Sequence, residues 1–177
     1  SFENSLKPAL FYEKLRGGIM AKTAAVSPET MTRIFTNVLE QGDDLLYIAF
    51  SSGLSSTYQN ACIARDELAE KYPDQKILCV DSLCASLGEG LLLDLVLRKA
   101  KEGADVGELA AYAEEIRVHV CHYFTVDDLN HLYRGGRVSK TTALFGTMLG
   151  IKPVMHVDNE GHLIPIGKVR GRRQSLD

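Results

Sequence analysis

The stretch LLYIAFSSGLSSTYQ, residues 45–59, combines two patterns that occur together in one class of fold. Residues 45–50 form a continuous apolar run of strand length, which is typical of a strand covered on both faces. Residues 51–57 are rich in serine, and a helical pattern then continues to about Tyr72. The order strand, polar loop, helix predicts an α/β protein built on a parallel sheet.

The same alternation extends on both sides of this stretch. Residues 27–41 are predicted as a helix, with Ser27 as the cap, Pro28 at the first helical position and Gly42 after the end. Residues 76–80 repeat the buried-strand pattern, and further helices are predicted over about 86–102 and 107–118. Strands that alternate with helices indicate right-handed crossovers, with helices on both faces of the sheet.

The pattern changes beyond residue 120. Here the sequence predicts a strand at 123–126, short helices at 127–133 and 139–149, and a hairpin of strands at 151–157 and 163–169. We therefore divide the chain into a parallel α/β domain (1–120) and a partial second domain of helices and a β-hairpin (121–177). The second piece is small for a self-supporting core, so we expect it to be incomplete.

Composition restricts the class of function. The chain has 177 residues, is 45% hydrophobic and carries a formal net charge of -3, which argues for a globular protein and against nucleic-acid binding. Its apolar runs are too short to span a bilayer and its start does not resemble a signal peptide, so we expect a cytoplasmic protein without membrane insertion. The four cysteines lack paired spacing, so we expect no metal site. We also expect no cofactor.

The serine-rich loop at residues 51–57 lies where a strand ends and a helix begins. The first N–H groups of a helix lack partners within it, and the peptide dipoles favour negative charge there, so the loop is suited to an anion. Gly53 allows close approach to the backbone, and Thr23 is a second source of hydroxyls. The loop has no Lys, no Arg and no phosphate-loop motif, which favours a carboxylate over a nucleoside triphosphate.

Three other interpretations of this loop stay open. The serines could serve only to cap a helix and shape a turn. A serine esterase could use a hydroxyl of residues 51–57, but the Gly-x-Ser-x-Gly elbow is missing and no histidine can be assigned as the base. A phosphate or sugar-phosphate binding protein is the third alternative.

Residues 51–59 resemble the Ser-Ser-Gly-Leu-Ser-Gly-Thr-Tyr-Gln signature of the DegV family, bacterial fatty-acid-binding proteins that include the acyl-carrying subunit of a fatty acid kinase. Further matches follow in the family's order, at residues 81–82, 85–90, 126–129, 135–140, 151–153 and 168–172. The sequence departs from the family at residues 24–26, where Ser-Gln-Pro is usual, and at Ser56, where glycine is usual.

This resemblance implies a two-domain α/β protein that holds a long-chain fatty acid such as palmitate between its domains and performs no chemistry itself. On the family's pattern, Thr23 and Ser52 contact the carboxylate, and Gly53 and Ser51 are secondary candidates. The bound acid is the only ligand that the resemblance implies.

The resemblance also implies partners and a longer chain. In kinase-coupled relatives a separate kinase subunit phosphorylates the bound acid, and Arg137 and Arg170 match basic residues that serve docking, with a structural role as the alternative. The family's chain begins earlier, with one more strand, and ends later, so part of the lipid tunnel is expected to be missing. We therefore expect this chain either to bind acid weakly or to self-associate and cover its exposed apolar wall.

Overall fold

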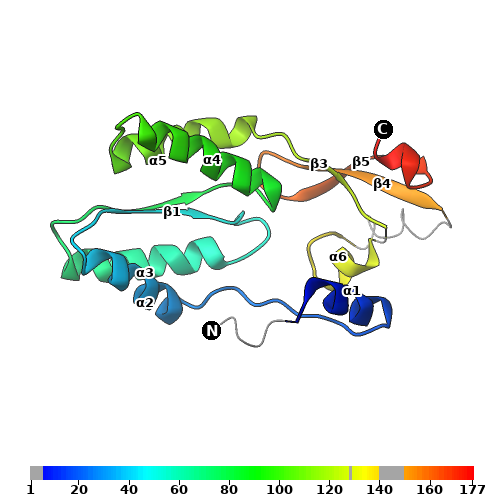
Figure 1. Ribbon diagram of the computed structural model, residues 1–177, viewed down its shortest axis with the longest axis horizontal. Helices are drawn as coiled ribbons and strands as arrows, with labels where there is room; N and C mark the ends of the chain where they lie inside the picture. Colours follow the sequence, from blue (N-terminus) through cyan, green and yellow to red (C-terminus); the bar gives the residue numbers. More distant parts are fainter. Residues whose placement is uncertain (1–5, 128, 140–149) are drawn as a thin grey trace.

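The computed structural model describes residues 6–127, 129–139 and 150–177. Its larger part is layered, with helices on both faces of a parallel strand pair (Figure 1). The strands are β1 (Leu45–Ala49) and β2 (Ile77–Asp81), paired from Leu45 opposite Ile77 to Ala49 opposite Asp81. One face carries α2 (Pro28–Leu39) and α3 (Thr57–Lys71), and the other carries α4 (Leu87–Lys101) and α5 (Val106–Ile116). The predicted α/β fold class is confirmed.

Successive residues of β1 and β2 point to opposite faces, so each strand contributes to two hydrophobic cores. Leu45 and Cys79 pack with Phe35 of α2 on one face, whereas Val80 packs with Leu92 of α4 on the other. Burial on both faces explains why the strands are apolar at nearly every position instead of alternating with polar residues.

Local signals start two of the helices. Ser27 Oγ accepts a hydrogen bond from the Thr30 backbone N–H at 3.3 Å, which caps α2 as predicted. Asp105 and Glu108 form a reciprocal capping box at the start of α5. The sequence pattern does not predict α1 (Pro8–Arg16), a helix that buries none of its residues.

The chain beyond residue 120 forms a separate antiparallel sheet, in the order β3, β4, β5. Its strands are β3 (Tyr123–Thr125), β4 (Ile151–Val157) and β5 (Leu163–Arg170), so the predicted hairpin is confirmed. The short helix α6 (Asn130–Arg134) lies beside this sheet and near α1 (Figure 1). A small core of Leu129, Val138 and Met155 holds it together.

Two predictions of the sequence are not settled by this fold. The helix expected at 139–149 lies almost wholly outside the described residues. The domain boundary at residue 120 stays a prediction. Within the described part of the chain, no helix combines the length and the apolar character needed to cross a bilayer.

Candidate functional site: a loop, a turn and an apolar cavity

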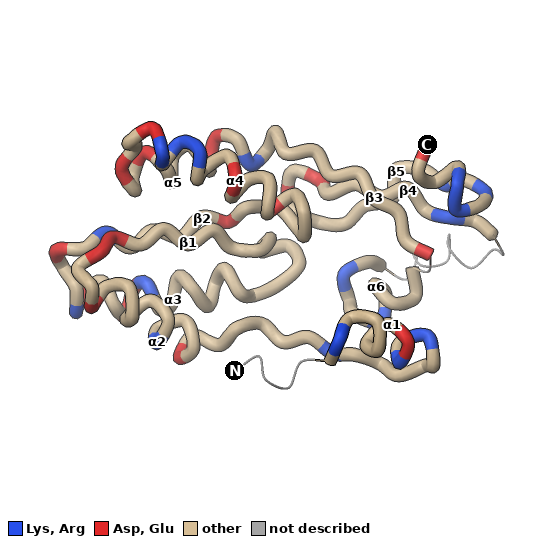
Figure 2. The backbone as a smooth tube through the Cα atoms, viewed as in Figure 1, with Lys and Arg blue, Asp and Glu red and all other residues tan. Residues whose placement is uncertain are grey.

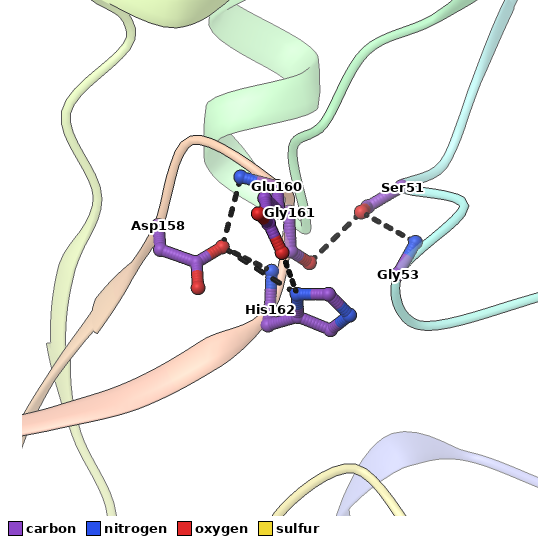
Figure 3. Close-up of polar contacts among 6 residues, drawn as sticks. All are labelled: Ser51, Gly53, Asp158, Glu160, Gly161 and His162. Carbon is purple, nitrogen blue, oxygen red and sulfur yellow. Dashed lines mark hydrogen bonds and ion pairs between the residues drawn. The ribbon is translucent and has the colours of Figure 1, made fainter.

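The serine loop after β1 is in direct contact with the turn of the β4–β5 hairpin. Ser51 is fully buried, and its Oγ donates a hydrogen bond to the Gly161 carbonyl at 2.8 Å (Figure 3). The same Oγ accepts a hydrogen bond from the Gly53 backbone N–H at 3.2 Å. One hydroxyl therefore shapes the loop and connects it to a segment 110 residues away in the sequence.

The loop and the turn each have a glycine where they meet, and a larger residue would clash at either position. A Cβ atom on Gly53 would lie 2.9 Å from the Glu160 carbonyl oxygen. Gly161 has a positive φ of 78°, and a Cβ there would collide with Ser51 Oγ. The turn is shaped by Asp158, whose Oδ1 accepts hydrogen bonds from the backbone N–H groups of Glu160 and His162 (Figure 3).

The end of β2 holds the other side of the serine loop. Asp81 is only 8% exposed, and its Oδ1 accepts hydrogen bonds from the Ser52 and Leu83 backbone N–H groups, both at 3.1 Å. Arg117 Nη1 donates to the Asp81 carbonyl at 2.7 Å. The carboxyl ends of the two parallel strands are thus joined by a buried carboxylate, which fixes the backbone of the loop.

A cavity of about 740 Å³ lies beside this loop. Its polar contributors include three hydroxyl residues and one cationic residue: Thr23, Ser55, Thr57 and Arg137. Its apolar walls include Phe50, Leu54, Leu91, Phe124, Val157 and Leu163. Side chains from the parallel layer and from the hairpin thus face one hollow, with hydroxyl groups and a guanidinium group among a mainly apolar surface.

Only one of the four predicted site residues lines the cavity. Thr23 lines it, whereas Ser51, Ser52 and Gly53 are not among its lining residues in the described chain. Ser55, whose Oγ lies 2.8 Å from Thr57 Oγ1, lines the cavity although the sequence analysis did not select it. The roles of Thr23 and Ser52 as carboxylate contacts stay predictions.

Arg137 brings a permanent positive charge to the cavity. Its Nε donates to the Leu54 carbonyl at 3.1 Å, and its Nη1 donates to the Gly135 carbonyl. The residue therefore links the loop after α6 to the serine loop, which is the structural role that the sequence analysis kept as an alternative. Arg170 lies at the end of β5, opposite Ile151.

The family model described as "Uncharacterised protein, DegV family" matches residues 1–177, which is the whole chain. The chain belongs to the DegV family. A DegV domain-containing protein of Clostridium perfringens is 45% identical over 176 residues, which cover 99% of this chain and 60% of the relative. This DegV chain thus spans about 60% of the length of the curated relatives that it matches.

Solved structures of DegV proteins share the fold. A structure described as "Fatty Acid Binding of a DegV family Protein" from Thermus thermophilus has a TM-score of 0.81 at 31% identity, covering 98% of this chain and 60% of that one. The fatty acid kinase B3 protein of Streptococcus pneumoniae, loaded with linoleic acid, has a TM-score of 0.80 and the same two coverages. Its identity of 24% shows the fold alone.

The DegV cavity also has a histidine in its wall. Ala85 donates its backbone N–H to His122 Nε2 at 3.4 Å, and a Cβ on Gly88 would collide with the same ring. Burial lowers the pKa of His122; the Val120 backbone opposes this in part, and the neighbouring His156 adds a smaller lowering. An Nε2 that accepts a hydrogen bond must be unprotonated, so this geometry needs the neutral ring.

The described residues also bear on the metal-site and esterase alternatives. In residues 6–127, 129–139 and 150–177, no cluster of three His, Cys, Asp or Glu side chains is arranged to hold a metal ion. Burial raises the pKa of Cys84 to about 11, so its thiol is protonated at neutral pH. Within the described residues, the hydroxyls of Ser51 and Ser55 pair with the Gly161 carbonyl and the Thr57 hydroxyl and not with a histidine.

Proposed function

We propose that this DegV chain binds a long-chain fatty acid such as palmitate and carries it without chemistry of its own. The observation that supports this most directly is the 740 Å³ cavity, which combines apolar walls with hydroxyl groups and Arg137. Cavities of about 300 to 1,000 Å³ are typical of small-molecule sites. The DegV structure from Thermus thermophilus, which is described as binding a fatty acid, adds support at the level of the family.

The energetics favour a ligand with both a tail and a charged head. Burying a methylene group contributes about 0.8 kcal/mol, so a long tail supplies most of the affinity. Neutral hydroxyl donors to a carboxylate contribute about 1.5 to 3 kcal/mol each, and a guanidinium adds a charge-assisted contact. We assign the head to the hydroxyls of Thr23 and Ser52, with Ser55 and Arg137 as neighbours. No cofactor is needed for this function.

A kinase partner belongs to the same proposal. In it, the bound acid is presented to a separate kinase subunit, with Arg137 and Arg170 at the docking surface. The likeness of fold to the Streptococcus pneumoniae B3 protein is compatible with this role. Replacing Arg170, which lies outside the cavity, should weaken association with a kinase subunit in a pull-down while fatty acid binding persists.

Mass spectrometry of lipid that co-purifies with the chain tests the main proposal. We expect a free long-chain acid, and the double variant Thr23→Ala/Ser52→Ala should lose it without unfolding. Ser56→Ala is the matched control, because Ser56 is exposed in the same loop and its side chain caps nothing. Turnover of an activated ester that disappears in Ser55→Ala would instead support the esterase, and displacement of ligand by phosphate would support a phosphate binder at the loop.

A further inference from the structure

Two segments in the wall of the 740 Å³ cavity, called the acyl cavity below, meet at the side chain of His122. Residues 85–88, which lead into α4, and residues 120–124, which follow α5, all line this cavity. The Ala85 backbone N–H donates to His122 Nε2 at 3.4 Å, and a Cβ atom on Gly88 would lie 1.7 Å from the same nitrogen. One imidazole ring therefore joins the two segments.

The backbone that His122 holds is strained on both sides of the contact. Leu83 and Ser86 have positive φ angles of 53° and 51°, which residues with a Cβ atom adopt only where the surrounding structure holds them. Ala85 lies between them, and its N–H is bonded to His122. Loss of this hydrogen bond would let the backbone relax, and Leu87, which is 87% exposed and lines the cavity, would move with it.

We propose that His122 is a positioning residue for the lipid: its neutral ring holds the start of α4 in the cavity wall, and its protonation loosens the wall and releases the bound acid. This inference rests on the fatty acid proposal above and adds a means of control to the same site. Nε2 accepts the Ala85 N–H only while it carries no proton, because both nitrogens of an imidazolium ring are donors.

The surroundings of His122 keep its ring neutral at pH 7. Burial lowers its pKa below the usual value near 6.5, the Val120 backbone opposes this in part, and charge repulsion from His156 adds a smaller lowering. His156 Nδ1 lies 2.9 Å from the His122 carbonyl oxygen, which places the two histidines side by side. Closure of the wall is therefore complete above about pH 6.5 and is lost as the pH falls below it.

Other charged and titratable groups surround the ring without belonging to its contact with Ala85. They are Cys121 and Tyr123 beside it in the chain, Arg117 after α5, His156 on β4, Asp158 in the hairpin turn, Glu89 on α4 and Arg137 in the cavity wall. Residues 118–126 contain no Lys, Arg, Asp or Glu, and the tube between α5 and the end of β3 is uncharged in Figure 2. The group that changes charge beside Ala85 is thus His122 itself.

Calorimetry of palmitate binding at pH 7.5 and pH 5 tests the effect of protonation. The native chain should lose at least about threefold in affinity relative to His122→Gln, because a glutamine amide oxygen accepts a hydrogen bond but does not titrate. Comparison of the two proteins at each pH cancels the titration of palmitate itself. His122→Phe, which keeps a ring but has no acceptor, should bind palmitate more weakly than the native chain at pH 7.5.

Hydrogen exchange of the ligand-free chain tests the contact without any lipid. At pH 7.5, amides within residues 83–91 should exchange at least about threefold faster in His122→Phe than in the native chain. Gly88→Ala should have the same effect, because its methyl group displaces the ring from Ala85. Gly90→Ala is the matched control, on the same helix but with open space at its Cβ position, and it should exchange like the native chain.

The outcomes separate this inference from the fatty acid proposal. An equal change of affinity with pH in the native chain and in His122→Gln would overturn the role of protonation. Native exchange of residues 83–91 in Gly88→Ala would overturn the hold on the wall, even if His122→Phe does not fold. Failure of palmitate to bind the native chain, with faster exchange in Gly88→Ala, would overturn the fatty acid proposal and leave the hold on the wall supported.

Discussion

Ser51 and Thr23 are both hydroxyl residues that the sequence places near a ligand, yet the molecule surrounds them differently. Ser51 is fully buried and bonded to Gly161 and Gly53. Thr23 is exposed and lines both the acyl cavity and a smaller second pocket. The comparison teaches that, of two hydroxyl residues predicted as ligand contacts, one can hold two segments of the fold together while the other lines the cavities.

The largest expected effect tests how tightly the Ser51 side is packed. Gly161→Ala places a side chain at positive φ and against Ser51 Oγ, so unfolding free energy should fall by about 2 to 5 kcal/mol. Gly103→Ala is the control, because Gly103 also has a positive φ but open space around its Cβ position; it should cost only about 1 to 2 kcal/mol. Denaturant unfolding measures both, and equal losses would show that the contact with Ser51 is loose.

The next effect tests the Thr23 side. Thr23→Val keeps the shape of the side chain but removes the hydroxyl, so palmitate affinity should fall by about 1.5 to 3 kcal/mol if that hydroxyl meets a carboxylate. Stability should change by less than about 0.5 kcal/mol, because the residue is exposed. Calorimetry of palmitate binding to Thr23→Val and to Ser52→Ala ranks the two predicted contacts. We expect Thr23 to contribute more, because it lines the cavity. An unchanged affinity in Thr23→Val would remove it from the site.

Ser51→Ala should give the opposite pattern. It leaves the buried Gly161 carbonyl and Gly53 N–H without their partner, which costs about 1 to 3 kcal/mol of stability. Palmitate affinity of the folded variant should stay close to that of the native chain, since Ser51 is not among the described residues that line the cavity. A large loss of affinity with unchanged stability would reverse the assignment of the two hydroxyls.

The smallest effect concerns pH. Because burial lowers the pKa of His122 in the folded state, the unfolded chain binds the proton more readily as the pH falls below about 6.5. Stability should therefore decline as the pH falls from about 6.5 through the lower folded-state pKa. Above about pH 6.5, His122 should have no effect on stability. His122→Gln should flatten that decline in denaturant unfolding between pH 5 and 8, and an unchanged pH profile in this variant would contradict the assignment.

Much of the fold was predictable because its signals are local. The apolar runs at 45–50 and 76–80 became strands buried on both faces, and Ser27 and Pro28 start a helix as expected. The sequence analysis did not select helix α1, whose apolar residues, including Leu10 and Phe11, stay exposed in the structure.

The site was predictable only in part. The sequence located the serine loop, but it could not indicate which hydroxyl turns inward, because that depends on Gly161, 110 residues further along the chain. In the same way, Arg137 reaches Leu54 across 83 residues. Partners this distant are brought together by the whole fold, which no short motif encodes.

That distance between partners also sets the order in which the binding site can form. Residues 23, 55, 137 and 163 reach the cavity from four separate segments, so an assembly intermediate with a complete helix-covered sheet but an undocked hairpin has no cavity. Contacts between distant segments are slow to form during folding. A bound lipid would therefore stabilise the molecule in which all four segments have come together, relative to forms in which they have not.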